Sequence, residues 1–154
     1  MYTNLNLSLN TSIHLGLGDD SYRYEAVKVF NQVLNRGRLR QFWARLLGKP
    51  NRLQTLGSQP VASHRTTSQI VSVAINQIKG SLGRSNDFDA SFNPLHERSR
   101  SRWISVAAAM RQHVPLPPVE LLQVGDSFFV RDGHHRISVA RAFGQEAIEA
   151  YIVG

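Results

Sequence analysis

One short segment of the chain, "FFVRDGHHRISVARAFG", from Phe128 to Gly144, carries the patterns of a strand, a turn and a helix in succession. Its first residues are apolar like a strand, Asp132 and Gly133 form a turn pair, and the residues after them repeat at helical spacing. Gly144 stands where a helix commonly ends. The segment therefore predicts a fold in which strands and helices pack together.

Other patterns add strands to this unit. Val119–Val124 and Ser127–Val130 have the composition of strands, and the Gly-Asp pair between them predicts a hairpin. Alternating apolar residues predict further strands at Val71–Ile75 and in the closing "AIEAYIV". We expect an α/β or α+β domain from about residue 70 to residue 154, with a small mixed sheet flanked by helices.

A second helix and a long loop complete the expected domain. Ser99 or Ser101 is suited to cap a helix that runs through Trp103 to Met110. The turn-rich "KGSLGRSNDFDASFNP" precedes it, and structureless connections of this length are uncommon unless they serve a function.

Residues 1–69 are expected to form an N-terminal extension. We predict a flexible start over the first 20 residues, a helical region from Tyr22 to Leu47 with a break at Gly37, and a linker from Gly48 to about Ser68. The apolar stripe of the helical region comprises Ala26, Val29, Phe30, Val33, Leu34, Leu39, Phe42, Trp43, Leu46 and Leu47. Its polar face carries Lys28, Arg36, Arg38, Arg40 and Arg45. That face is either solvated or in contact with nucleic acid or a membrane surface.

Charge and composition narrow the classes of function. The net charge is +7, and residues 1–70 carry nine Lys and Arg against three acids. A nucleic acid or another anion is therefore a candidate partner. The lack of cysteine excludes disulfides and thiolate chemistry. We find neither a membrane-spanning run nor a secretory signal, and expect a cytoplasmic protein without a membrane partner; the sequence does not indicate an oligomeric state.

Arg136 falls on the apolar side of the helix that follows Gly133. A buried guanidinium needs a partner that satisfies it. That partner is either a carboxylate of the chain or a bound anion, because unpaired N–H groups at a helix start attract phosphate and Gly133 lets a ligand approach the backbone. The candidate carboxylates are Asp132, Asp87, Asp89 and Glu97. We also expect Asp132 to cap the helix.

His134 and His135 have less specific roles in the sequence. Neighbouring helical residues diverge by about 100°, so the pair is poorly placed to ligate one metal ion, and we predict no metal site there. One histidine is expected to contact phosphate or act as an acid or base, with His135 taken as a catalytic candidate, and the other to pack locally.

The long loop offers additional polar groups. The stretch "GSLGR" presents the Ser81 hydroxyl and Arg84 to a phosphate. In "DFD", Asp87 and Asp89 either hold a divalent ion bridged to phosphates, act as a general base, or only cap turns of the loop. Both are candidate catalytic residues.

Several stretches resemble the ParB/sulfiredoxin superfamily, in particular its short bacterial ParB-like members. They are "VAINQIKGSLGRSNDFDASFNP", "RSRW", "LPPVELLQVGDSFFVRDGHHRISVARAFG" and "IEAYIV", all between Val71 and Gly154. The Gly-x-x-Arg turn, Gly133 to Arg136, matches the superfamily turn that binds nucleotide phosphates. The resemblance implies that Asp132, Gly133, His134, His135 and Arg136 bind a nucleoside triphosphate or diphosphate together with Mg²⁺.

The same resemblance bears on the type of activity. Asp-Gly-His-His-Arg is similar to the turn of free-serine kinases of this fold, which implies an NTPase or a small-molecule kinase. Sulfiredoxins have a cysteine where this chain has His134, so sulfinic acid repair by their mechanism is excluded. The alternatives are a DNA-binding or nuclease module that uses the basic N-terminal helices, and a regulatory protein that binds nucleotide without catalysis.

Overall fold

The computed structural model describes residues 18–56 and 69–153. Its elements, in chain order, are α1 (Gly18–Leu46), β1 (Gln54–Thr55), β2 (Val71–Ala74), η1 (Ile75–Gln77), β3 (Ile78–Ser81), η2 (Glu97–Ser99), α2 (Arg100–Arg111), β4 (Val119–Val124), β5 (Ser127–Asp132), α3 (His134–Ala142) and β6 (Ala147–Val153). The elements η1 and η2 are single turns of 3-10 helix. Residues 1–17 of the predicted flexible start and most of the predicted linker lie outside the described residues, whereas residues 18–20 of that start belong to α1.

The strands form a six-stranded mixed sheet in the order β1-β3-β5-β4-β6-β2. β4 and β5 pair antiparallel around Gly125, whose φ is +59°, so the predicted hairpin is confirmed. β3 and β5 run parallel, as do β4 and β6. The expectation of an α+β fold with a small mixed sheet and flanking helices is confirmed.

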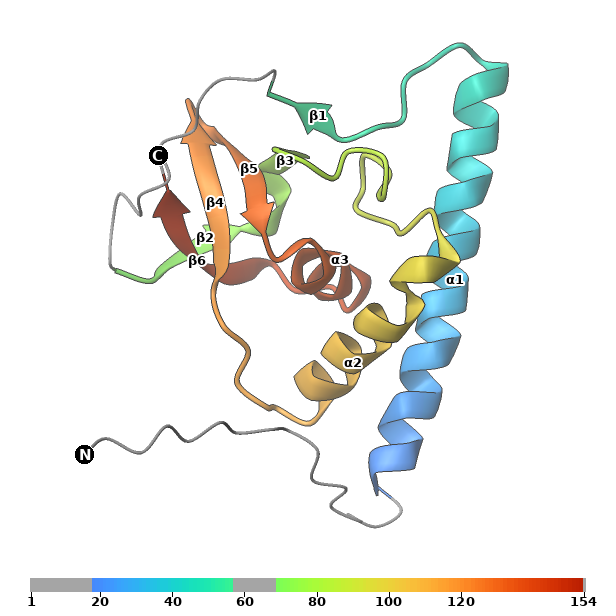
Figure 1. The fold of residues 1–154 in the computed structure, drawn as a ribbon, viewed down its shortest axis with the longest axis vertical. Coiled ribbons are helices and arrows are strands. Elements are labelled where there is room, and N and C mark those ends of the chain that lie inside the picture. The colour runs from blue at the N-terminus through green and yellow to red at the C-terminus, as the bar shows by residue number, and fades with distance from the viewer. Residues whose placement is uncertain (1–17, 57–68, 154) are drawn as a thin grey trace, which may run out of the picture.

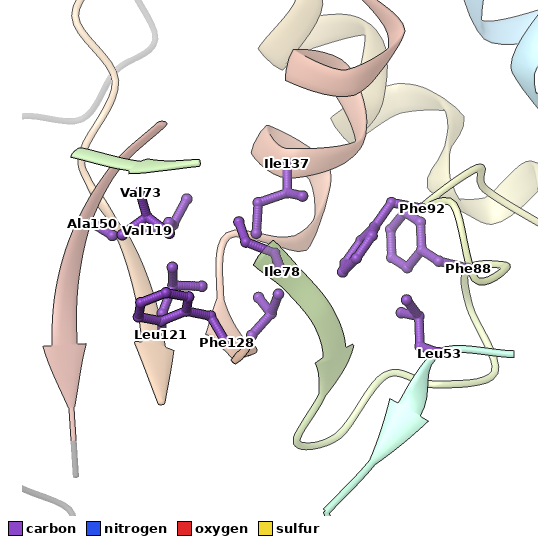
Figure 2. Close-up of a cluster of buried hydrophobic side chains, with 11 residues drawn as sticks. Leu53, Val73, Ile78, Phe88, Phe92, Val119, Leu121, Phe128, Ile137 and Ala150 are labelled. Atoms are coloured by element: carbon purple, nitrogen blue, oxygen red, sulfur yellow. The ribbon is translucent and has the colours of Figure 1, made fainter. Parts of the chain in front are cut away.

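The sheet supports one of two apolar clusters. Its members come from the strands, from the start of α3 and from the loop after β3 (Figure 2). They are Leu53, Val73, Ile78, Phe88, Phe92, Val119, Leu121, Phe128, Val130, Ile137 and Ala150. Ile137 brings α3 into this cluster and so packs the helix against the sheet.

The helices share a second cluster on the other side of α3. It unites Ala26, Phe30, Val33 and Leu34 of α1 with Trp103, Ile104 and Ala107 of α2 and Val139 of α3. α2 contacts both other helices and lies between them, with α1 along one side of the molecule (Figure 1). The first half of α1 is therefore docked on the domain, and the boundary at residue 69 stays a prediction.

Gly37 does not break the helical region, and that expectation is wrong. α1 runs without interruption from Gly18 to Leu46. A Cβ atom at Gly37 would lie 2.9 Å from the backbone oxygen of Pro94. The glycine therefore allows the loop after β3 to pack closely against the helix.

The apolar stripe predicted along α1 is in fact two stripes on different faces. Ala26, Phe30, Val33 and Leu34 are at most 5% exposed, whereas Leu39, Phe42, Trp43, Leu46 and Leu47 are between 50% and 65% exposed. Spacing by three and four holds within each set, but the step from Leu34 to Leu39 is five residues, so the second set lies on another face of the helix, away from the domain.

Two strands lie where the sequence predicted loop or linker. β3 occupies the start of the long loop, and β1 pairs with it in parallel at the sheet edge. Gly80 makes this pairing possible, because a Cβ there would lie 2.3 Å from the backbone oxygen of Gln54 and 2.5 Å from the Phe129 ring. Among the described helices, none is long and apolar enough to cross a bilayer.

Candidate functional site

A pocket of about 240 Å³ lies at the start of α3. Six of the predicted site residues line it, namely Arg84, Asp132, Gly133, His134, His135 and Arg136. Arg102, Val106, Leu116 and Pro117 complete its lining. Three other predicted residues do not line it: Ser81 ends β3, and Asp87 and Asp89 lie in the loop that follows.

Gly133 makes the sharp turn from β5 into α3. Its φ is +101° and its ψ is 20°, values that side chains strongly disfavour. A Cβ atom at this position would lie 2.4 Å from Cγ1 of Val119 and 3.3 Å from Cζ of Arg136. Glycine is required here both by the backbone angle and by the close packing of the turn.

The first turn of α3 lacks a side-chain cap. Gly133 occupies the N-cap position, and no side-chain hydrogen bond caps the helix there. Asp132 does not cap α3 as expected, because its carboxylate accepts a hydrogen bond from Arg136 instead, at 2.7 Å. The leading N–H groups of a helix carry partial positive charge, so this helix start favours an anion.

Arg136 has the internal partner that its position on the apolar side requires. Its side chain is 14% exposed and pairs with Asp132. The same guanidinium donates hydrogen bonds to the backbone oxygens of Pro117 and Pro118. Arg136 thus ties the turn to the segment before β4, while one edge of it still lines the pocket.

Two further arginines bring positive charge to the pocket with little compensation. Arg84 is half exposed and lies 3.9 Å from Asp87, which is a long ion pair. Arg102, on α2, is exposed and has no ion pair within the described part of the chain. Arg102 was not among the predicted site residues, because its place opposite α3 depends on how α2 packs.

Ser81 fixes the orientation of His134. The backbone N–H groups of Gly83 and Arg84 donate to Ser81 Oγ, at 3.2 and 2.9 Å. Because a hydroxyl has two lone pairs and one hydrogen, Ser81 then donates its own hydrogen to His134 Nε2, 2.7 Å away. His134 is neutral in this arrangement, with its proton on Nδ1.

His135 is less constrained than its neighbour. Its Nε2 is buried without a hydrogen-bond partner among the described residues. The ring of Phe88 packs edge-on against it and lies stacked on His134. His134 is therefore the histidine that packs and hydrogen-bonds locally. His135 lines the pocket, and its Nε2 has no hydrogen-bond partner among the described residues.

Both histidines are held in the neutral form. The pKa of His134 is lowered from 6.5 to about 4, mainly by burial and to a smaller extent by the neighbouring Arg84 and His135. Burial also lowers the pKa of His135 to about 4, with contributions from Arg102 and Arg84. Asp132 and Asp87 act in the opposite direction on both rings, but more weakly. Desolvation and surrounding arginines thus remove the protonated form at neutral pH.

Asp89 organises the loop after β3. Its carboxylate is fully buried and accepts hydrogen bonds from the backbone N–H groups of Ser91 and Asn93 and from the Asn93 side chain. These are the turn-capping contacts that the sequence analysis weighed against a catalytic role. The three donors occupy both carboxylate oxygens, which removes Asp89 from easy contact with a ligand.

Asp87 is also engaged within the loop. It accepts a hydrogen bond from Arg98 and lies near Arg84. Its side chain is 20% exposed. Within residues 18–56 and 69–153, no three histidine, aspartate or glutamate side chains gather in a way that could hold a metal ion.

Comparisons with known proteins add little to this geometry. No family model and no curated protein matches the chain. Among solved structures, the crystal structure of sulfiredoxin from Arabidopsis thaliana is similar over 55% of this chain and 83% of that one, at 18% sequence identity and a TM-score of 0.42. Sulfiredoxins belong to the superfamily that the sequence resembles, but so weak a likeness carries no argument about function.

Proposed function

We propose that the chain binds the phosphates of a nucleotide in the pocket at the start of α3. The observation that supports this proposal is the charge of the lining: Arg84, Arg102 and Arg136 meet an uncapped helix start, while Asp132 is the only carboxylate among the described residues that line the pocket and is paired with Arg136. Such a pocket favours an anion with several charges.

The size of the pocket and its apolar side indicate which part of a nucleotide it can hold. About 240 Å³ is below the roughly 300–1,000 Å³ typical of pockets that enclose a drug-sized ligand. The pocket therefore suits phosphates and part of a sugar, with Val106, Leu116 and Pro117 offering an apolar edge toward the base. Mg²⁺ is commonly bound by one or two carboxylates together with substrate phosphates, and the exposed Asp132 supplies one carboxylate.

Replacing Arg102 by alanine is expected to weaken nucleotide binding roughly tenfold to a hundredfold, the worth of one charge-assisted contact. The free energy of unfolding should change by less than about 0.5 kcal/mol, because Arg102 is exposed. Calorimetric titration with nucleoside di- and triphosphates, with and without Mg²⁺, measures the first quantity, and urea unfolding measures the second.

Two further variants make this test specific. Lys79→Gln, which removes an exposed cation of β3 outside the pocket, should leave nucleotide affinity unchanged. Arg136→Ala should lose both affinity and stability, since that side chain also holds Asp132 and two backbone oxygens. Equal affinities for Arg102→Ala and the wild type would contradict the proposal.

We further propose that His135 is the general base if bound nucleotide is turned over. Asp87 and Asp89 are engaged by loop contacts and His134 by Ser81, whereas the buried Nε2 of His135 has no hydrogen-bond partner among the described residues and is unprotonated at neutral pH because the pKa of His135 is lowered to about 4. His135→Asn should abolish phosphate release from a nucleoside triphosphate while nucleotide affinity stays within a few fold. Nucleotide binding without phosphate release in the wild type would favour the regulatory alternative.

A further inference from the structure

The exposed face in the second half of α1 suggests an interaction surface that is separate from the pocket. It consists of Leu39, Phe42, Trp43, Leu46 and Leu47, which we call the outer stripe. Hydrogen bonding from Leu47 N–H to the Trp43 oxygen continues the helical pattern to the last of them. Contiguous exposed apolar side chains of this kind commonly mark an interaction site.

The outer stripe lies on the side of α1 that faces away from the domain. With about 100° per residue, its members fall within an arc of about 140°, roughly opposite the buried side chains of Phe30 and Leu34. α1 itself runs along one side of the molecule (Figure 1). A flat partner can therefore approach the stripe along the helix without displacing the docked face.

Positive charge flanks the outer stripe on both sides. On the helical wheel, Arg40 lies beside one edge and Arg38 and Arg45 lie beside the other, while Arg36 falls within the arc, just before the stripe begins. Residues 36–56 contain six Lys and Arg and no acid. Arg38 and Arg45 are exposed and form no ion pair with other described residues. The partner of this surface should therefore offer apolar groups to the outer stripe and anionic groups to the arginines beside it.

We propose that the outer stripe docks on the surface of an anionic phospholipid membrane, a partner that was not expected from the sequence. Its leucines and aromatic rings lie at the boundary between headgroups and acyl chains, and its flanking arginines contact lipid phosphates. A helix with an apolar face and basic flanks is the usual form of a segment that lies in the membrane interface. Tryptophan is also enriched at that depth.

Other partners fit the surface less well. A second copy of the chain would bring arginine flanks against arginine flanks, which repel. A coiled-coil partner needs apolar positions sustained over about three to four heptads, and the outer stripe spans only residues 39–47. Nucleic acid would use the arginines but leave the apolar side chains in water.

The test uses the full chain with vesicles of phosphatidylcholine alone or mixed with phosphatidylserine. Trp43 is 50% exposed and Trp103 is fully buried, so a blue shift of tryptophan emission reports entry of Trp43 into lipid. We expect cosedimentation and a blue shift with the mixed vesicles, and neither with phosphatidylcholine alone. Trp43→Phe should retain the cosedimentation and lose the shift.

The double variant Phe42→Gln, Leu46→Gln should bind the mixed vesicles at least about tenfold more weakly, because two large apolar side chains no longer enter lipid. Both residues are exposed, so the fold should persist. Val114→Gln, at a similarly exposed apolar residue outside α1, is the matched control and should bind as the wild type does.

Three outcomes would overturn the proposal. The first is the absence of binding to the mixed vesicles. The second is binding that depends on Arg38 and Arg45 but is the same in the Phe42→Gln, Leu46→Gln variant, which would indicate attraction of charge alone, as to nucleic acid. The third is dimerisation without lipid that the same double variant abolishes, measured by sedimentation equilibrium, because the stripe would then be a contact between copies.

Discussion

Alanine at position 133 is expected to destabilise the protein by about 4 kcal/mol. Two causes act together. The φ of +101° is unfavourable for any residue with a Cβ atom, and that atom would lie 2.4 Å and 2.8 Å from two carbons of Val119. Val119 is buried at the start of β4 and cannot move away without disturbing the sheet. Urea unfolding of Gly133→Ala beside the wild type measures the loss.

Gly125→Ala separates the two causes. Gly125 also has a positive φ, +59°, but a Cβ atom there would meet nothing within 4 Å. This control should therefore lose only about 1 kcal/mol, the cost of the backbone angle. If Gly133→Ala were no more harmful than Gly125→Ala, the close packing between the turn and β4 would be disproved.

Acid is expected to destabilise the fold between pH 6.5 and about pH 4. In that range the unfolded chain binds protons at both histidines of the turn, whose pKa in the folded protein is about 4. Because the unfolded state binds more protons, stability falls as the pH falls, and this contribution levels off below about pH 4. At about 1.4 kcal/mol per pKa unit, the loss is on the order of 3 kcal/mol for His134 and less for the partly exposed His135.

The pH dependence of the free energy of unfolding, measured with urea across that range, checks this expectation. His134→Asn should reduce the slope by about half, since one of the two protons taken up on unfolding is lost. The slope is the useful quantity, because it is interpretable even if the variant is less stable overall. A slope that is unchanged in His134→Asn would show that other groups cause the acid sensitivity.

Elements that depend on residues close together in the sequence could be predicted. The hairpin at Gly125 and the helix that ends before Gly144 follow from residues within a few positions of each other, and both are confirmed. β3 and β1 were missed, because the sheet pairing that defines them joins residues far apart in the sequence. Gly37 was misjudged for the same reason, since its close neighbour, Pro94, is remote in the sequence.

The candidate site divides in a similar way. The turn from Asp132 to Arg136 was predicted from its own residues, and the helical wheel placed Arg136 on the apolar side, where its side chain is indeed largely buried. The sequence could not decide between Asp132 and a bound anion as its partner, nor assign separate roles to the two histidines. The separate roles of the two histidines depend on Ser81 and Phe88, which are remote in the sequence and reach the turn only when the chain folds. The position of Arg102 at the pocket could not be predicted either, because it depends on how α2 packs against α3.

The loop after β3 acts as a fixed wall beside the pocket. It carries Phe88 against both histidines, and the hydrogen bonds of Asp89 fasten it from within. Arg40 of α1 donates a hydrogen bond to Ser91 and fastens it from outside. Long loops beside ligand sites often serve as lids that open for each ligand. Here the loop is already held in place, so a ligand would bind without a preceding opening of this loop.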